Sequence, residues 1–109
     1  MDYTKATEDI REFLLEAGAH ALKIQKDIDR EYKRGYEAVT QADLDISKMA
    51  AERLSHWFEQ DEHVLIDEES ADQIPSPEKV FSTTKYQWVL DPVDGTAGYA
   101  MGRDRWGVS

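Results

Sequence analysis

Two acidic clusters hold the residues of this 109-residue chain whose types and spacing could do chemistry. The first is Glu68-Glu69-Ser70 and the second is Asp91-Pro92-Val93-Asp94-Gly95-Thr96. Hard divalent cations such as Mg²⁺ take oxygen ligands in octahedral geometry, and a bound cation neutralises phosphate charge and acidifies a water. Glu68, Asp91 and Asp94 could supply such ligands, so the clusters point to metal-assisted phosphate chemistry.

The second cluster reads as a tight turn. Asp91 and Asp94 are three positions apart and can aim at adjacent points, while the Val93 carbonyl is free to act as a further ligand. Gly95 lets the backbone approach a ligand closely, and a short helix could begin at Thr96, so their amides could hold a phosphate oxygen. On spacing alone, a structural turn and a metal site stay equally open. An EF-hand is disfavoured because its required positions are not filled.

Composition limits the classes of partner. Lys and Arg total 13 against 23 for Asp and Glu, and the net charge of -10 repels nucleic-acid phosphates and anionic lipid heads. An acidic chain still binds a phosphorylated small molecule when its carboxylates first collect divalent cations. The chain has no cysteine, no secretory signal and no apolar span, which predicts a cytoplasmic protein without a nucleic-acid or membrane partner.

Two amphipathic helices are expected before the first cluster. Apolar residues with three-then-four spacing predict a helix over about 5–33 that ends near Lys33-Arg34-Gly35. Thr40 and Asp43 have the spacing of a capping box, which predicts a second helix over about 42–60.

Short apolar runs are expected to place both clusters at strand ends. The runs predict strands over about 63–67, before the first cluster, and about 86–91, which stops at Asp91-Pro92. Residues 105–109 look like the beginning of a third strand. The fold class is therefore α+β. Because sheet edges stay open, residues 1–109 are taken as a portion of a single domain.

A Glu-Glu-Ser turn after a strand, followed by a second strand that runs into Asp-Pro-(Ile or Val)-Asp-Gly-Thr, resembles the inositol monophosphatase superfamily of magnesium-dependent, lithium-sensitive phosphatases. The upstream Val39-Thr40-Gln41-Ala42-Asp43 and the long first helix also match, so the resemblance covers essentially the whole chain. It implies that residues 1–109 are the amino-terminal portion of a layered α/β sugar-phosphatase fold of the inositol monophosphatase/fructose-1,6-bisphosphatase type, whose carboxyl-terminal half is absent. It also implies hydrolysis of a small phosphate monoester such as inositol monophosphate, and a homodimer when the protein is full length.

By position, the resemblance implies that Glu68, Asp91 and the Val93 carbonyl hold the first Mg²⁺ ion. Asp91 and Asp94 would hold the second, in a site of two or three ions.

The resemblance further implies that Thr96 hydrogen-bonds Asp43, and that this pair orients and helps deprotonate the metal-bound water that attacks phosphorus in line. The residues alone favour the capping role for Asp43. Glu69 would orient the ligand or a neighbouring water, and it reads equally well as a solvated surface acid.

The chain departs from the family pattern in two places. Asp67 stands where glycine is usual, and Gly98 stands where inositol monophosphatases commonly have asparagine. Residues 102–107 resemble the histidinol-phosphate phosphatase branch, so histidinol phosphate is an alternative substrate. A bisphosphate nucleotide, the substrate of another branch of the superfamily, is a further alternative. Arg103 and Arg105 are interpreted as exposed loop residues outside the site. A different class, a non-catalytic acidic interaction module, would need no magnesium.

Overall fold

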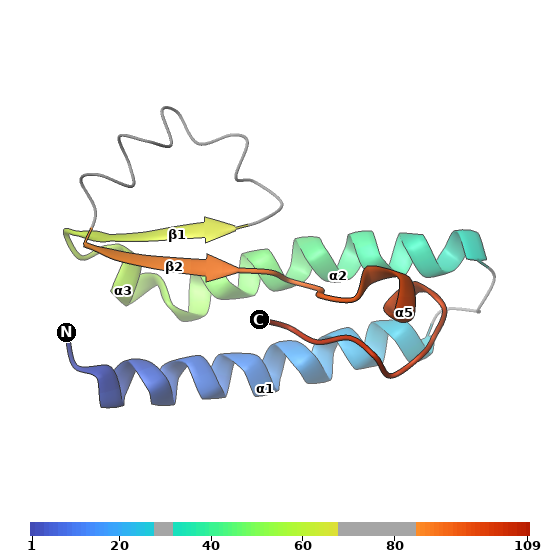
Figure 1. The fold of residues 1–109 in the computed structure, drawn as a ribbon, viewed down its shortest axis with the longest axis horizontal. Helices are drawn as coiled ribbons and strands as arrows, with labels where there is room; N and C mark the ends of the chain where they lie inside the picture. Colours follow the sequence, from blue (N-terminus) through green and yellow to red (C-terminus); the bar gives the residue numbers. More distant parts are fainter. Residues whose placement is uncertain (28–31, 68–84) are drawn as a thin grey trace.

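The computed structural model describes residues 1–27, 32–67 and 85–109, with side chains from residue 36 onward in the second range. In chain order the elements are α1 (Tyr3–Asp27), α2 (Tyr32–Arg53), α3 (Ser55–Phe58), β1 (His63–Asp67), β2 (Tyr86–Leu90) and α5 (Thr96–Ala100). Helices α1 and α2 lie side by side and run in opposite directions (Figure 1). The sheet lies over one end of this pair and α5 lies toward the other (Figure 1).

Small side chains hold α1 and α2 together. The buried residues recur every four positions along each helix: Phe13, Ala17 and Ala21 on α1, and Ala38, Ala42, Ile46 and Ala50 on α2. Because the distance between packed helices depends on the side chains at the contact, these alanines allow a close approach. Of the helices in the described ranges, none is long and apolar enough to cross a membrane.

The first helix begins earlier than the apolar pattern predicts. The Oδ1 atom of Asp2 accepts a hydrogen bond from the Lys5 amide at 3.0 Å, which is the geometry of an N-cap residue. The helix therefore begins at Tyr3 instead of at about residue 5.

The predicted break between the two long helices is wrong. Helix α1 ends at Asp27 and α2 already begins at Tyr32, so the expected end near Gly35 and the expected start at about 42 both fail. Residues 28–31 lie outside the described residues. The second helix also ends earlier than 60, because the backbone of Leu54 turns between α2 and α3.

Burial explains why the capping box fails. Thr40 lies inside α2, where its hydroxyl donates to the Tyr36 carbonyl at 3.1 Å instead of capping a helix start. Ala38 and Val39 are buried just before it, in the same row as Ala42. Continuing the helix through Thr40 buries these apolar residues against the core, and this gain outweighs a cap.

Aromatic side chains fasten the sheet to α3. The Trp88 ring of β2 lies 5.6 Å, between centroids, from each of Trp57 and Phe58 on the α3 side. The Trp88 Nε1–H also donates to Nδ1 of His63 at the start of β1, at 3.1 Å. These contacts fix the strand pair on the helices and so fix where the strands end.

The expected third strand over 105–109 is wrong as a continuous strand. Within this segment the structure has one isolated antiparallel bridge, between Gly107 and Asp94. The pairing is interrupted because the opposing segment carries an extra residue, as described below.

Candidate metal and phosphate site

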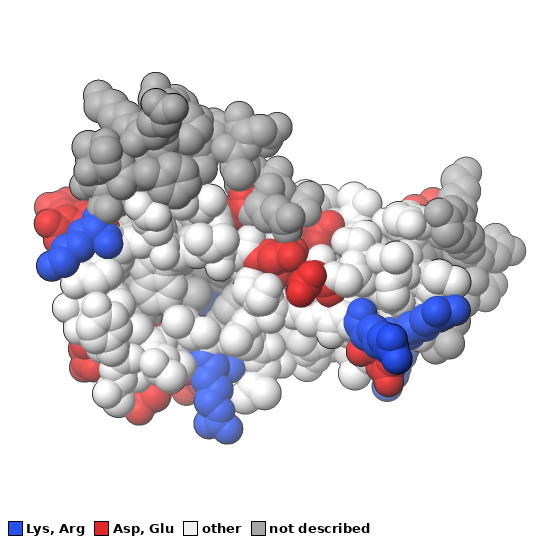
Figure 2. Space-filling view, in the orientation of Figure 1, with Lys and Arg blue, Asp and Glu red and all other residues white. Residues whose placement is uncertain are grey.

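The carboxyl ends of the two parallel strands lie at the same edge of the sheet. β1 and β2 pair in parallel, with Asp67 opposite Leu90, so both carboxyl ends meet at the same place (Figure 1). Asp and Glu side chains gather beside these strand ends on the face in Figure 2. Glu68, Glu69 and Ser70 follow β1 but lie outside the described residues. From the second cluster, Asp91 follows β2 directly.

Backbone hydrogen bonds hold both acids of the second cluster in place. The Asp91 amide donates to the Ser109 carbonyl at 2.6 Å, and the Ser109 amide donates back at 3.0 Å. Asp94 exchanges the same two bonds with Gly107, at 2.8 and 3.0 Å. The main chain of each aspartate is therefore fixed without use of its carboxylate, which stays available for a ligand.

The turn between the two aspartates is a β-bulge. Pro92 and Val93 together face the single residue Val108, because Asp91 pairs with Ser109 while Asp94 pairs with Gly107. Proline suits this position since it has no amide hydrogen to leave unpaired. Both bulge residues are buried, and they anchor the turn to the core.

The oxygen atoms of this turn fit a hard divalent cation. Asp91 is half-buried and Asp94 is exposed. The Val93 carbonyl accepts only a long hydrogen bond, 3.4 Å from the Thr96 hydroxyl, so it keeps a lone pair for a metal ion. Within residues 1–27, 32–67 and 85–109, no three acids or histidines group around a single point. The predicted third carboxylate, Glu68, lies outside those ranges.

Two glycines let the chain fold tightly over the start of α5. Gly95 has φ 86°, a left-handed conformation, and a Cβ there would lie 2.6 Å from the Arg105 carbonyl oxygen. A Cβ on Gly98 would lie 2.7 Å from the same oxygen. This close approach explains why glycine occupies position 98 in this chain, because an asparagine there would displace Arg105. Thr96 begins α5, whose first amides have no acceptor within the helix.

Side chains outside the two predicted motifs anchor α5 to α1. The buried Gln25 amide donates to the carbonyls of Tyr99 and Arg103, at 2.9 and 3.0 Å. The Tyr99 hydroxyl donates to the Ala21 carbonyl at 2.7 Å. One signal was available in the sequence. Gln25 is a polar residue four positions after Ala21 on the buried face, where a polar group requires partners.

Asp43 approaches α5 from α2. Its carboxylate is half-buried, and its charge acts on Tyr99. Burial, followed by the nearby charges of Asp43 and Asp45, raises the pKa of Tyr99 to about 12. The Thr96 hydroxyl, the predicted partner of Asp43, instead donates to Val93. Asp43 is therefore at the α5 end of the molecule, and its pairing with Thr96 stays a prediction.

Replacing Tyr99 with phenylalanine is expected to remove a pH dependence of stability. The pKa of Tyr99 rises from 10.0 to about 12 on folding, so the folded state holds this proton more tightly. The resulting stabilisation is complete below pH 10 and is lost as pH rises toward 12. Urea unfolding at several pH values between 8 and 11 should show the wild type losing stability relative to Tyr99→Phe. A difference that does not change with pH would contradict this expectation.

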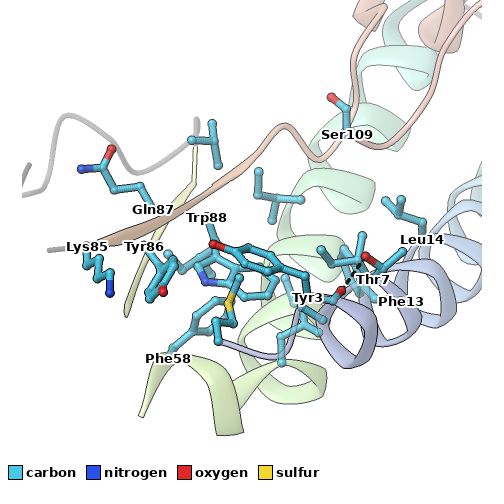
Figure 3. A pocket seen from close by; sticks show the side chains of 18 residues that line it. Tyr3, Thr7, Phe13, Leu14, Phe58, Lys85, Tyr86, Gln87, Trp88 and Ser109 are labelled. Atoms are coloured by element: carbon cyan, nitrogen blue, oxygen red, sulfur yellow. Dashed lines mark hydrogen bonds between the residues drawn. The ribbon is translucent and has the colours of Figure 1, made fainter. Parts of the chain in front are cut away.

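A pocket elsewhere in the molecule does not suit this chemistry. It has a volume of about 470 Å³ and lies between the start of α1 and β2, with Tyr3, Phe13, Leu14, Phe58 and Trp88 in its lining (Figure 3). Among the described residues, no acid or histidine lines it.

The structure is that of a mixed helix-and-strand protein in which carboxylate and carbonyl oxygens lie beside a short, tightly anchored helix. The model of the inositol monophosphatase family matches residues 3–109. The chain therefore belongs to the inositol monophosphatase family, which confirms the resemblance seen in its two motifs. Members of this family are phosphatases and are generally metal-dependent. No curated protein and no solved structure matches the chain.

Proposed function

We propose that this chain is part of an enzyme that hydrolyses a small phosphate monoester, such as inositol monophosphate, with Mg²⁺ as cofactor. One observation carries the proposal. The parallel register of β1 and β2 brings the chain segments that lead into both acidic motifs to a single sheet edge. Family membership over residues 3–109 supports the reaction class.

The proposed metal ligands are Glu68, Asp91, Asp94 and the Val93 carbonyl, for two or three ions. When bound, Mg²⁺ would neutralise phosphate charge and acidify a water. The hydrogen bonds that fix Asp91 and Asp94 support this assignment, because ligands with a fixed backbone lose little freedom on binding. Glu69 is proposed to orient one of these ligands or a neighbouring water without binding the metal ion itself.

The other proposed roles belong to the start of α5 and to Asp43. The amides of Gly95 and Thr96 would bind a phosphate oxygen, as amides without helical acceptors do. The Asp43 carboxylate would accept the hydrogen of the Thr96 hydroxyl, which would then accept a hydrogen bond from the attacking water and orient it. This requires Thr96 to rotate away from Val93, and the 3.4 Å length of that contact means that little is lost.

Metal removal from the full-length protein tests the proposed function. Phosphate release from inositol 1-phosphate should require Mg²⁺, stop when EDTA is added and return when Mg²⁺ is restored in excess. Histidinol phosphate and adenosine 3′,5′-bisphosphate, assayed in parallel, decide which substrate is preferred. Absence of Mg²⁺-dependent release from all three would favour the interaction module instead.

The remaining proposals concern the state of the full-length protein. We also propose a homodimer and a cytoplasmic location, and the net charge of -10 argues against nucleic acid as a partner. Light scattering that gives the mass of one chain, or cell fractionation that places the protein outside the cytoplasm, would contradict them.

A further inference from the structure

Residues Gly102–Arg105, which we call the basic loop, are held in a defined position. The Gly102 amide donates to the Tyr99 carbonyl at 3.0 Å, and the Arg103 amide donates to the Gly98 carbonyl at 2.9 Å. Gln25 binds the Arg103 carbonyl from α1. Gly102 has φ 72°, which favours glycine at this bend. Hydrogen bonds and close packing therefore fix the loop backbone.

The two arginines of the basic loop present unneutralised positive charge. Both side chains are exposed, and neither forms an ion pair with a carboxylate of the described residues, Asp104 included. By contrast, Arg53 binds Glu16 through two nitrogens, at 2.8 to 3.2 Å. Arg103 and Arg105, which flank Asp104, therefore have no carboxylate partner among the described residues, and an arginine side chain in this state is well suited to bind an anion.

The basic loop borders the proposed phosphate site. The Arg105 carbonyl packs on the Gly95 and Gly98 backbone at the start of α5. Lys and Arg side chains gather over the segment that follows α5, on the same face as the acids at the strand ends (Figure 2). An open hollow of about 610 Å³ is lined by the four residues of the loop. The hollow is open to solvent and can hold a charged group beside the two arginines.

We propose that Arg103 and Arg105 bind a second anionic group of the substrate, one that is not removed, and thereby determine specificity. This inference rests on the proposed function. Arginine suits the task because its planar fork binds the oxygens of a phosphate or carboxylate in pairs. The preferred substrate is then a small phosphate monoester with another phosphate or carboxylate on the same molecule.

Kinetics of the full-length protein with a matched pair of substrates test this inference. Inositol 1-phosphate and inositol 1,4-bisphosphate differ only in the second phosphate. Arg103→Gln or Arg105→Gln should raise KM for the bisphosphate about 10-fold with kcat retained, and change KM for the monophosphate less than about 2-fold. Arg11→Gln, an exposed arginine on α1 with the same loss of charge, should change neither KM.

Each alternative outcome overturns the inference. Equal increases in KM for both substrates would mean that the arginines bind the phosphate that is removed. An effect of Arg11→Gln as large as that of Arg105→Gln would mean that only net charge matters. Unchanged kinetics in both loop variants, with normal phosphate release, would overturn the inference alone. No release from either substrate by the wild type would overturn the proposed function as well.

Discussion

Replacing Asp91 with asparagine in the full-length protein is expected to lower kcat/KM for Mg²⁺-dependent phosphate release by at least ~100-fold. Asparagine keeps the shape of the side chain but removes the charge that a divalent cation requires, and Asp91 is proposed to serve two ions. The fold should survive, because the bonds between Asp91 and Ser109 use only the main chain. Phosphate release measured over a series of Mg²⁺ concentrations, with a melting curve for each protein, checks both statements.

Two further variants show whether the effect of Asp91→Asn is specific to a metal ligand. Asp61→Asn removes the same charge from an exposed acid before β1, and should leave kcat/KM within about 2-fold of the wild type. Asp43→Asn should lower kcat by about 100-fold while the Mg²⁺ dependence stays as in the wild type, because Asp43 is proposed to act on the water through Thr96. A fully active Asp91→Asn protein would mean that the turn is structural only.

Replacing Gly95 with alanine is expected to destabilise the protein by about 2–5 kcal/mol. The left-handed conformation of Gly95, with φ 86°, is unfavourable for a residue with a Cβ atom. That atom would also meet the Arg105 carbonyl oxygen at 2.6 Å, and a backbone atom cannot move aside easily. The free energy of unfolding in urea measures the loss.

Gly18 provides the matched control for this substitution. It lies inside α1, and a Cβ there would meet nothing within 4 Å. Gly18→Ala should therefore stabilise the protein, by up to about 1 kcal/mol, since alanine is the better helix former. If Gly95→Ala and Gly18→Ala changed stability equally, the close packing of Arg105 on α5 would not exist in solution.

Local sequence patterns carry part of this fold. The strands are short apolar runs between polar turns, and each is followed by acids. The break between α1 and α2 could not be found in the same way. Thr40 and Gly35 favour a helix boundary locally, whereas the burial of Ala38 depends on packing against other elements of the chain. A helix boundary predicted from local residue preferences is wrong where packing against another element stabilises a longer helix.

The candidate site was also only partly predictable from the sequence. The motif residues identified the family, because their types and order are specific. Their support could not be predicted, since Gln25 and Tyr99 reach partners 74 to 78 positions away in the sequence. The roles of Asp43 and Thr96 stay predictions.

The bulge between Asp91 and Asp94 decides on which side of the chain the two carboxylates lie. Side chains alternate along a regular strand, so residues three positions apart point to opposite faces. Here the paired positions on the other segment, Ser109 and Gly107, are only two apart and share a face. The extra residue of the bulge thus shifts the alternation of side chains by one position. As a result Asp91 and Asp94, although three positions apart, present their carboxylate oxygens to the same side.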